Sequence, residues 1–156
     1  MALLPWLISA IFPACGALGA SGLPPSPPMD MAAIVRPASP NTALAGPAGF
    51  LPAPDIVVAP FMLPPDRLYA TIRAVAGAQP LTFPAAAYDD RRQLHYVART
   101  AALNFPDLVA VAVAGPAEGP STLVIYSRSV YGRSDFGANR KRVEVWLAAL
   151  RTTIER

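Results

Sequence analysis

The stretch LVAVAVAGPAEGPSTLVIYSRSVY, residues 108–131, decides the fold class of this chain. Its first part, residues 108–113, alternates valine with alanine, so a strand here has one β-branched face and one small face. The last strand is predicted over residues 122–131. The loop between them, residues 115–120, is rich in glycine and proline, which are typical of turns. A connection this short predicts that the two strands pair antiparallel.

Working outward, the pattern predicts three more strands and a short helix before this hairpin. The predicted strands cover residues 55–61, 81–88 and 94–103, with turns at 89–92 and 104–107. The predicted helix begins near Pro64 and Pro65 and ends at Gly77, because proline suits a first helical turn and glycine a helix end.

A second helix is predicted at the end of the chain, over residues 139–155. Val143, Trp146, Leu147, Leu150 and Ile154 recur at helical spacing and form one apolar stripe, in which Trp146 is the largest side chain. The element order is β-α-β-β-β-β-α. It predicts an α+β fold in which two helices cover one face of an antiparallel sheet, an arrangement that resembles a reduced helix-grip fold.

The N-terminal third has the composition of a leader and a linker. No charged side chain occurs before residue 30, and 14 of the 19 prolines lie at or before Pro65. Residues 1–22 resemble a signal peptide, with Ala17-Leu18-Gly19 as a cleavage tripeptide, or a retained membrane anchor. Residues 23–54 are predicted to be an extended linker that need not pack, and residues 55–156 a single domain.

Two alternatives for this segment stay open. Cys15, the only cysteine, follows a small residue as in lipoprotein signals and is a candidate lipidation site. Translation that starts at Met29 or Met31 would instead produce a cytoplasmic protein. A signal peptide, a membrane anchor or a lipidated Cys15 each predicts an exported or membrane-associated protein of the cell envelope.

Positive charge is concentrated at the C-terminus. The chain carries a formal net charge of +3, and residues 127–156 hold seven Lys or Arg and three acidic residues. Such an end can face an anion, although a solvated helix face has the same composition. The Arg140-Lys141-Arg142 run lacks an aromatic platform, which argues against nucleic acid.

The junction between the last strand and the last helix is the candidate binding site. Free amides at a helix N-terminus attract anions, and arginine adds donors that match phosphate or carboxylate. The competing interpretation is structural, because serine, aspartate and asparagine also cap helices. The candidate residues are Ser127, Arg128, Ser129, Gly132, Arg133, Ser134, Asp135, Asn139 and Arg140.

Other chemistry has little support in the sequence. His95 is the only histidine, so neither a histidine metal site nor a catalytic pair can be assembled around it from the sequence. No catalytic residue, metal site or cofactor is predicted.

The stretch SRSVYGRSDFGANRKRV, residues 127–143, resembles the signature of the domain of unknown function family 1499. Residues 36–41 resemble the Ser-Pro-Asn entry motif of that family, and residues 105–107 its Phe-Pro-Asp turn. Thr42 stands where many members carry cysteine, so a redox role of those cysteines does not carry over. The resemblance implies a shared surface at residues 127–140, often behind an export signal or lipid anchor, and no assigned activity.

Three functions remain as expectations. The first is non-catalytic binding of an anionic or amphipathic ligand, such as a small anion or a lipid, by a domain attached to a membrane through its N-terminus. The second is an enzyme that acts on a phosphorylated or carboxylated substrate. The third is a structural or protein-interaction module.

Overall fold

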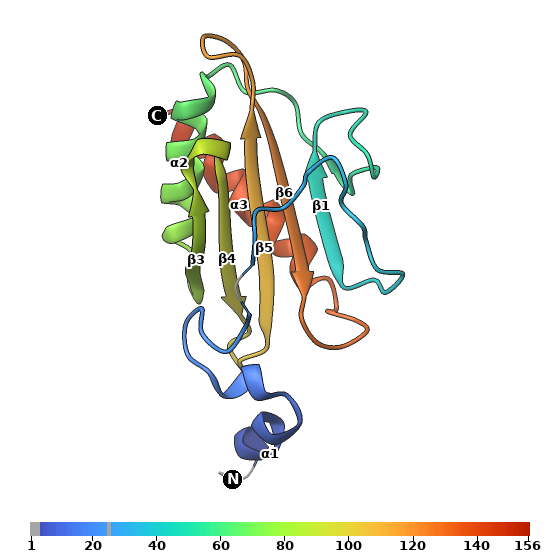
Figure 1. Cartoon of the computed structure of the whole chain (residues 1–156). Coiled ribbons are helices and arrows are strands. Elements are labelled where there is room, and N and C mark those ends of the chain that lie inside the picture. The colour runs from blue at the N-terminus through green and yellow to red at the C-terminus, as the bar shows by residue number, and fades with distance from the viewer. Residues whose placement is uncertain (1–3, 25) are drawn as a thin grey trace.

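A six-stranded sheet forms the centre of the computed structural model, which describes residues 4–24 and 26–156 (Figure 1). The strands are ordered β2-β1-β6-β5-β4-β3 across the sheet. Their bounds are β1 Thr42–Gly46, β2 Ile56–Val57, β3 Thr82–Tyr88, β4 Gln93–Arg99, β5 Pro106–Ala114 and β6 Thr122–Ser129. The helices are α1 Leu4–Ile11, α2 Pro65–Gly77 and α3 Ala138–Ile154, with short 3-10 turns at Pro13–Gly16 and Asp89–Arg91. The α+β prediction is confirmed.

Helices α2 and α3 pack on one face of the sheet, as their apolar stripes predict. The main core joins the inward side chains of both helices to alternate residues of β4, β5 and β6. Trp146 is 1 % exposed, and its ring meets Tyr96 edge-on at a centroid distance of 5.6 Å. Trp146 therefore occupies the centre of the core, as the periodicity of the helix indicated. The helix-grip likeness remains a prediction.

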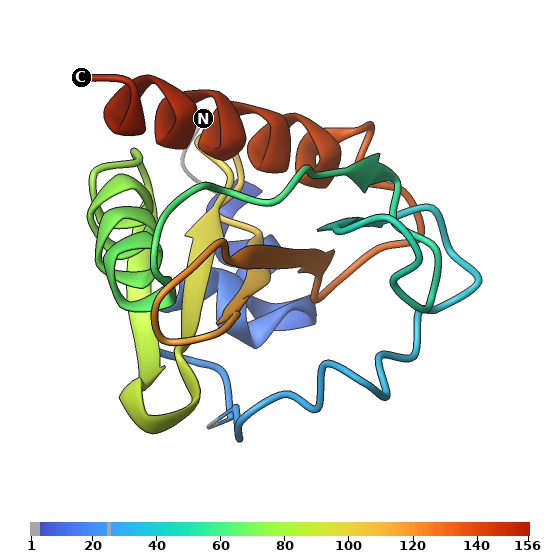
Figure 2. The same cartoon turned by 90° about the horizontal axis from the view of Figure 1, so that it is seen from above.

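The opposite face of the sheet is covered by residues 26–41, which we call the strap. Figure 2 shows α3 along one side of the sheet and this proline-rich segment along the other. The side-chain amide of Gln93 bonds the amide and the carbonyl of Met29 at 3.0 and 2.7 Å, and Ile34 joins a second apolar cluster with Leu44 and Tyr126. The expectation that residues 23–54 need not pack is wrong. The second face of the sheet carries apolar side chains, among them Leu44 and Tyr126, and this segment buries them.

Strand β1 also lies inside the predicted linker, so the packed domain does not begin near residue 55. Residues of β1 pair antiparallel with β6, and two of them pair parallel with β2. The sheet is therefore mixed rather than purely antiparallel. Strand β1 has the composition Thr-Ala-Leu-Ala-Gly, whose small residues carry a weak strand signal. Its pairing comes from tertiary contacts.

Three predicted strands end early, and the last of them, predicted to residue 131, stops at Ser129. The stretch 55–61 contributes β2 and a single bridge between Phe61 and Ser121, because prolines interrupt it. Strand β4 stops at Arg99 instead of residue 103, and the chain turns through Asn104 with φ 56°. Asparagine tolerates this left-handed conformation better than most residues.

Helix α1 lies at the end of the molecule near the turn between β4 and β5 (Figure 1). It has eight residues. Of the helices in residues 4–24 and 26–156, none has the length and apolar character needed to cross a bilayer.

Candidate functional site

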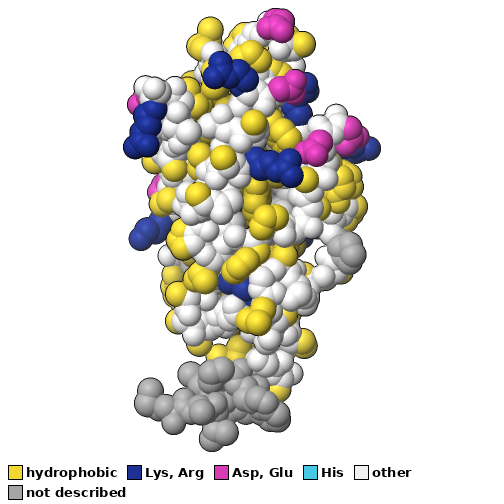
Figure 3. Space-filling model, turned by 90° about the vertical axis from the view of Figure 1, so that its left-hand side faces the viewer, with side chains coloured by type: hydrophobic (Ala, Val, Ile, Leu, Met, Phe, Trp, Pro, Cys, Tyr) yellow, Lys and Arg dark blue, Asp and Glu magenta, His cyan; other side chains and the backbone are white. Residues whose placement is uncertain are grey.

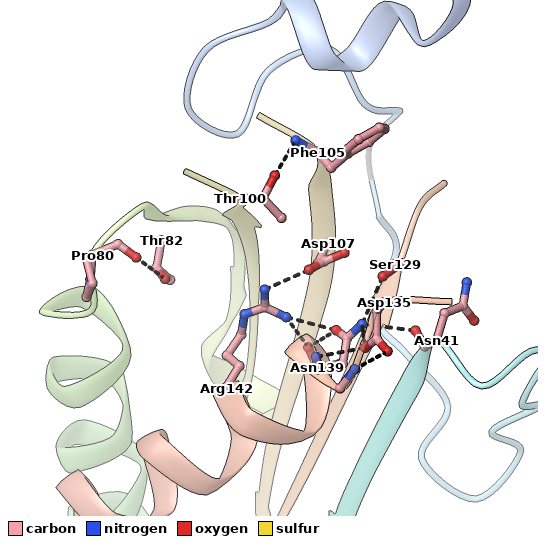
Figure 4. A network of polar contacts seen from close by, with 12 residues as sticks. Asn41, Pro80, Thr82, Thr100, Phe105, Asp107, Ser129, Asp135, Asn139 and Arg142 are labelled. Carbon is pink, nitrogen blue, oxygen red and sulfur yellow. Dashed lines mark hydrogen bonds and ion pairs between the residues drawn. The ribbon is translucent and has the colours of Figure 1, made fainter. Parts of the chain in front are cut away.

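A buried polar network joins the start of α3 to β1, β5 and β6 (Figure 4). Asn139 is fully buried at its centre. Its Oδ1 accepts hydrogen bonds from Ser127 at 2.6 Å and Arg142 at 2.9 Å. Its Nδ2 donates to the Asn41 carbonyl, the Ser129 hydroxyl and the Asp135 carboxylate at 3.0, 2.9 and 2.7 Å. Asn139 thus acts as a structural clamp between layers.

An ion pair extends this network. Arg142 Nη2 lies 2.7 Å from Oδ2 of Asp107, and both side chains are largely buried. Arg142 Nη1 also donates to Ser127 and Asn139. Ser127, a candidate for substrate chemistry, is therefore surrounded by partners inside the protein and lies away from solvent.

The N-terminus of α3 is occupied by a carboxylate of the chain itself. Asp135 accepts hydrogen bonds from the amides of Gly137 at 3.0 Å and Asn139 at 2.8 Å. Burial raises the pKa of Asp135, but the hydrogen bonds from Asn139 and Gly137 outweigh it and hold the pKa below its usual value. The expectation that free amides at this helix start attract an external anion is wrong for these two amides, because Asp135 already caps them.

Arg128 lies on the other side of the sheet from this network. Side chains alternate along a strand, so Ser127 faces α3 and Arg128 faces the strap. The Arg128 side chain is half-buried and makes no hydrogen bond or ion pair with any residue that the structure describes. Unlike Arg142, it has donors left for a ligand.

A cavity of about 620 Å³, which we call the strap pocket, opens beside Arg128. It lies between the strap and β6. Apolar and polar side chains line it together; among them are Met29, Ile34, Val35, Tyr126 and Arg128, with Asp30 as an acidic residue at the strap. Apolar walls with one unpaired guanidinium favour a ligand that has both an apolar part and a negative charge.

Two polar side chains beneath the strap lack well-formed hydrogen bonds. Tyr126 is 3 % exposed and His95 is 4 % exposed. The Tyr126 hydroxyl is not hydrogen-bonded to any residue described, and the ring nitrogens of His95 make no well-formed hydrogen bond there, although the carbonyl of Ser26 lies near that ring. Burial raises the pKa of Tyr126, so its hydroxyl keeps its proton and can donate. Burial also lowers the pKa of His95, which the carbonyl of Ser26 partly opposes, so its ring favours the neutral form.

The registry of the sheet explains why there is room around these groups. His95, Ala110 and Tyr126 lie opposite one another on β4, β5 and β6. The middle residue is small, so the sheet has a shallow depression between the two larger side chains. A cavity of about 20 Å³ lies there, and it shares Met29, Tyr126 and Arg128 with the strap pocket. Unpaired buried polar groups are costly, and their presence at a cavity is typical of ligand sites.

Of the other candidate residues, Ser129 alone also lines the strap pocket with Arg128. Gly132, Ser134 and Asp135 line a second, more apolar cavity of about 310 Å³. Arg133 and Arg140 are exposed, and Arg140 pairs with Glu144 at 3.0 Å. In Figure 3, which views the side of α2 and β3, acidic and basic side chains are mixed rather than gathered by sign. The predicted site is thus divided between a structural network and the strap pocket.

Cys15, the candidate lipidation site, is 6 % exposed in this fold, and burial raises the pKa of its thiol. No group of three His, Cys, Asp or Glu side chains converges within the described parts of the chain, so no residues there present a metal-binding set.

Tyr126, His95 and the strap were absent from the sequence-based site. One signal was available, since Tyr126 stands two residues before Arg128 on the same strand and must share its face. The strap was missed because its proline-rich composition is also that of a free linker.

Comparison with known families agrees with the resemblance noted in the sequence. The family described as "Protein of unknown function (DUF1499)" matches residues 33–150, well over half of the chain. None of the curated proteins compared with the chain matches it. The family match includes most of the strap and all six strands.

Proposed function

The chain belongs to the DUF1499 family of proteins of unknown function, and on that premise we propose that it is a non-catalytic binding domain of the cell envelope. Its ligand is an anionic amphiphile, a molecule with one carboxylate or phosphate group and an apolar tail. The single observation that carries the proposal is the unpaired, half-buried guanidinium of Arg128 in the strap pocket.

The size and walls of the strap pocket suit such a ligand. A volume of about 620 Å³ lies within the range of small-molecule sites. Arg128 offers two parallel donors to the oxygens of a carboxylate or phosphate. The hydroxyl of Tyr126 supplies one more donor from the same face. Met29, Ile34 and Val35 offer contact surface to an apolar tail.

The strap allows a ligand to enter without opening the main core. Its apolar residues form a separate small cluster, and its hydrogen bonds to the sheet include the reciprocal pair between Met29 and Gln93. The two ends of the strap are fixed by hydrogen bonds, Met29 to Gln93 at one end and Asn41 to Gly132 at the other. Residues 30–35 between them make no hydrogen bond to another described segment, so this middle part separates from the sheet at less cost than the helices on the other face. Lifting the strap would widen the small cavity beside His95 and Tyr126.

Binding is preferred to catalysis because the reactive groups of residues 127–135 are already engaged. The hydroxyl of Ser127 is bonded to Asn139 and Arg142 in a fully buried position. Asp135 caps α3. An enzyme would need a base beside an accessible nucleophile, and neither residue is free for such a role.

A protein-interaction module is also less well supported. The free edge of the sheet at β3 carries Pro84 and a shift of register between Pro84 and Ala86. Both features disfavour pairing with a strand of another protein. The proposed location in the cell envelope rests on the apolar, uncharged N-terminal segment.

Calorimetric titration of the full chain tests the proposal. The probes are dodecanoate and dodecyl phosphate, each below its critical micelle concentration, with the neutral monododecanoyl glycerol and inorganic phosphate as controls. We expect one anionic probe or both to bind, and the two controls to bind at least tenfold more weakly. Comparison of the two anions identifies the preferred head group.

Matched variants place the binding site. Arg128→Ala is expected to weaken binding about tenfold or more, because a hydrogen bond to a charged group contributes about 1.5–3 kcal/mol. Arg133→Ala removes the same charge from an exposed position outside the strap pocket and should leave the affinity unchanged. Equal binding of neutral and anionic probes, or equal effects of the two substitutions, would contradict the proposal.

A further inference from the structure

A second recognition site lies at the end of β4, where Arg99 and Asn104 meet the N-terminal segment. We call residues 12–21 the N-terminal plug. Arg99 is 5 % exposed. Its guanidinium donates to the main-chain carbonyls of Ala14, Gly19 and Ser21 at 2.8, 2.7 and 2.9 Å. Three carbonyls of the plug therefore converge on one side chain.

Asn104 holds two more carbonyls of the same segment. Its Nδ2 donates to Cys15 at 2.7 Å and to Ala17 at 2.9 Å. The main-chain carbonyl of Asn104 accepts a hydrogen bond from the Arg99 guanidinium at 3.0 Å, so the two residues form one unit. Main-chain carbonyls are present in any peptide. These five hydrogen bonds therefore depend on the main-chain conformation of the plug and not on the identity of its side chains.

Aromatic side chains fix the other end of the plug. The ring of Phe12 lies 5.5 Å from that of Phe105 and 4.9 Å from that of Tyr131. The amide of Ala14 donates to the Tyr131 hydroxyl at 3.3 Å. The plug is thus bound through both its backbone and an apolar anchor.

The charge of Arg99 makes these contacts energetically important. Within residues 4–24 and 26–156, no carboxylate pairs with this guanidinium, whose described hydrogen bonds all go to main-chain carbonyls. A buried charge is costly unless it is hydrogen-bonded. Cleavage at the tripeptide 17–19 would detach the carbonyls of Ala14 and Cys15 from this corner.

We infer that the N-terminal plug remains a permanent part of the folded domain, held in a carbonyl-binding site that Arg99 and Asn104 provide. The segment is then a retained part of the domain that holds α1 at this end of the molecule, and it is not a signal peptide that is removed. This inference is independent of the strap pocket, because the two sites share no residue.

Nicking the full chain tests the inference. A protease recognition sequence is inserted after Leu23, the purified protein is cut in mild detergent, and gel filtration with native mass spectrometry follows the N-terminal fragment. We expect the fragment to stay bound to the rest of the chain. Immediate release of the fragment after cutting would overturn the inference.

Variants distinguish retention through the hydrogen bonds of Asn104 from non-specific hydrophobic association of the apolar fragment. Asn104→Gly removes the two amide hydrogen bonds and still permits the positive φ at this position, so the domain should fold. We expect the fragment to leave at least tenfold faster than from the unsubstituted protein. Arg91→Gln, at an exposed arginine in the turn at the other end of β4, is the control and should not change release. Retention by Asn104→Gly equal to that of the control would refute the assignment.

Intact-mass measurement supplies a second, independent readout. The chain is expressed in a bacterium with its native N-terminus, and the membrane and soluble fractions are measured. The full-length mass supports retention of the plug. A mass that corresponds to cleavage within or just after residues 17–19 would overturn it.

Discussion

The hydroxyl of Ser127 donates a 2.6 Å hydrogen bond to Oδ1 of Asn139, although the two residues belong to different layers of the fold. Ser127 lies on β6 and Asn139 in the first turn of α3, and neither is exposed. This contact fixes the position of α3 relative to β6. Residues of the stretch that resembles a family signature therefore stabilise the packing of α3 on the sheet.

Replacing the centre of this network should destabilise the protein strongly. Asn139→Ala leaves buried partners of Asn139, among them Ser127 and Arg142, without one of their hydrogen bonds. We expect a loss of about 3 kcal/mol in the free energy of unfolding. Chemical denaturation measures it. Arg140→Ala, on the exposed next residue, should change stability by less than about 1 kcal/mol.

The buried ion pair between Arg142 and Asp107 predicts non-additive effects. Arg142→Met leaves the carboxylate of Asp107 buried without its guanidinium, at a cost of about 3–5 kcal/mol. The double variant Arg142→Met with Asp107→Leu should recover much of that loss. A double-mutant cycle measured by denaturation gives the coupling. Additive single effects would contradict the assignment of this pair.

Asp135 predicts a pH dependence of stability. Its pKa in the folded protein is held below the ordinary value near 3.8 by the hydrogen bonds from Asn139 and Gly137, which outweigh burial. The stabilisation by Asp135 is therefore present above that ordinary value and is lost as the pH falls through the lower pKa of the folded state. Denaturation of the unsubstituted chain and of Asp135→Asn should give a constant difference between pH 7 and 5 that shrinks below pH 4. A difference that grows on acidification would contradict this role.

Tyr126→Phe should separate stability from binding. The Tyr126 hydroxyl is buried without a partner in the described chain, so its removal should raise the stability of the ligand-free protein by about 1 kcal/mol. The same change should weaken binding of the anionic amphiphile severalfold. Thermal unfolding and calorimetry measure the two effects. Tyr69→Phe is the control, since its hydroxyl donates to Asp89 at 2.7 Å and its loss should lower stability.

Local patterns predicted the elements that carry most of the core. The stripe that includes Trp146 is a property of consecutive residues, and α3 formed within one residue of the predicted bounds. The alternation in residues 94–99 and 108–113 assigned the correct faces, since Leu94 and Val109 lie in the core with the helices. Hydrophobic periodicity was sufficient to predict these elements, because a helix or a long strand buries one face whatever segment packs against it.

The candidate site was predicted less well. Arg128 and Ser127 are adjacent in the sequence, but they face opposite sides of the sheet and belong to different environments. Asp135 was considered both as a cap and as part of an anion site, and the hydrogen bonds that its carboxylate accepts from the amides of Gly137 and Asn139 make it a cap. Whether a polar side chain forms hydrogen bonds within the protein or stays available to a ligand depends on which segment packs against its face of the sheet. Amino-acid composition does not determine that packing.

The sequence by itself determined the α+β class, the two helices of the core face and the faces of the long strands, because each follows from periodic burial within a short segment. Only the tertiary structure decided that residues 42–46 form a strand and that residues 26–41 cover the second face. Short segments of small residues and proline have little local preference. Their conformation is selected by the apolar area and the sheet hydrogen bonds that they complete in partners distant in the sequence.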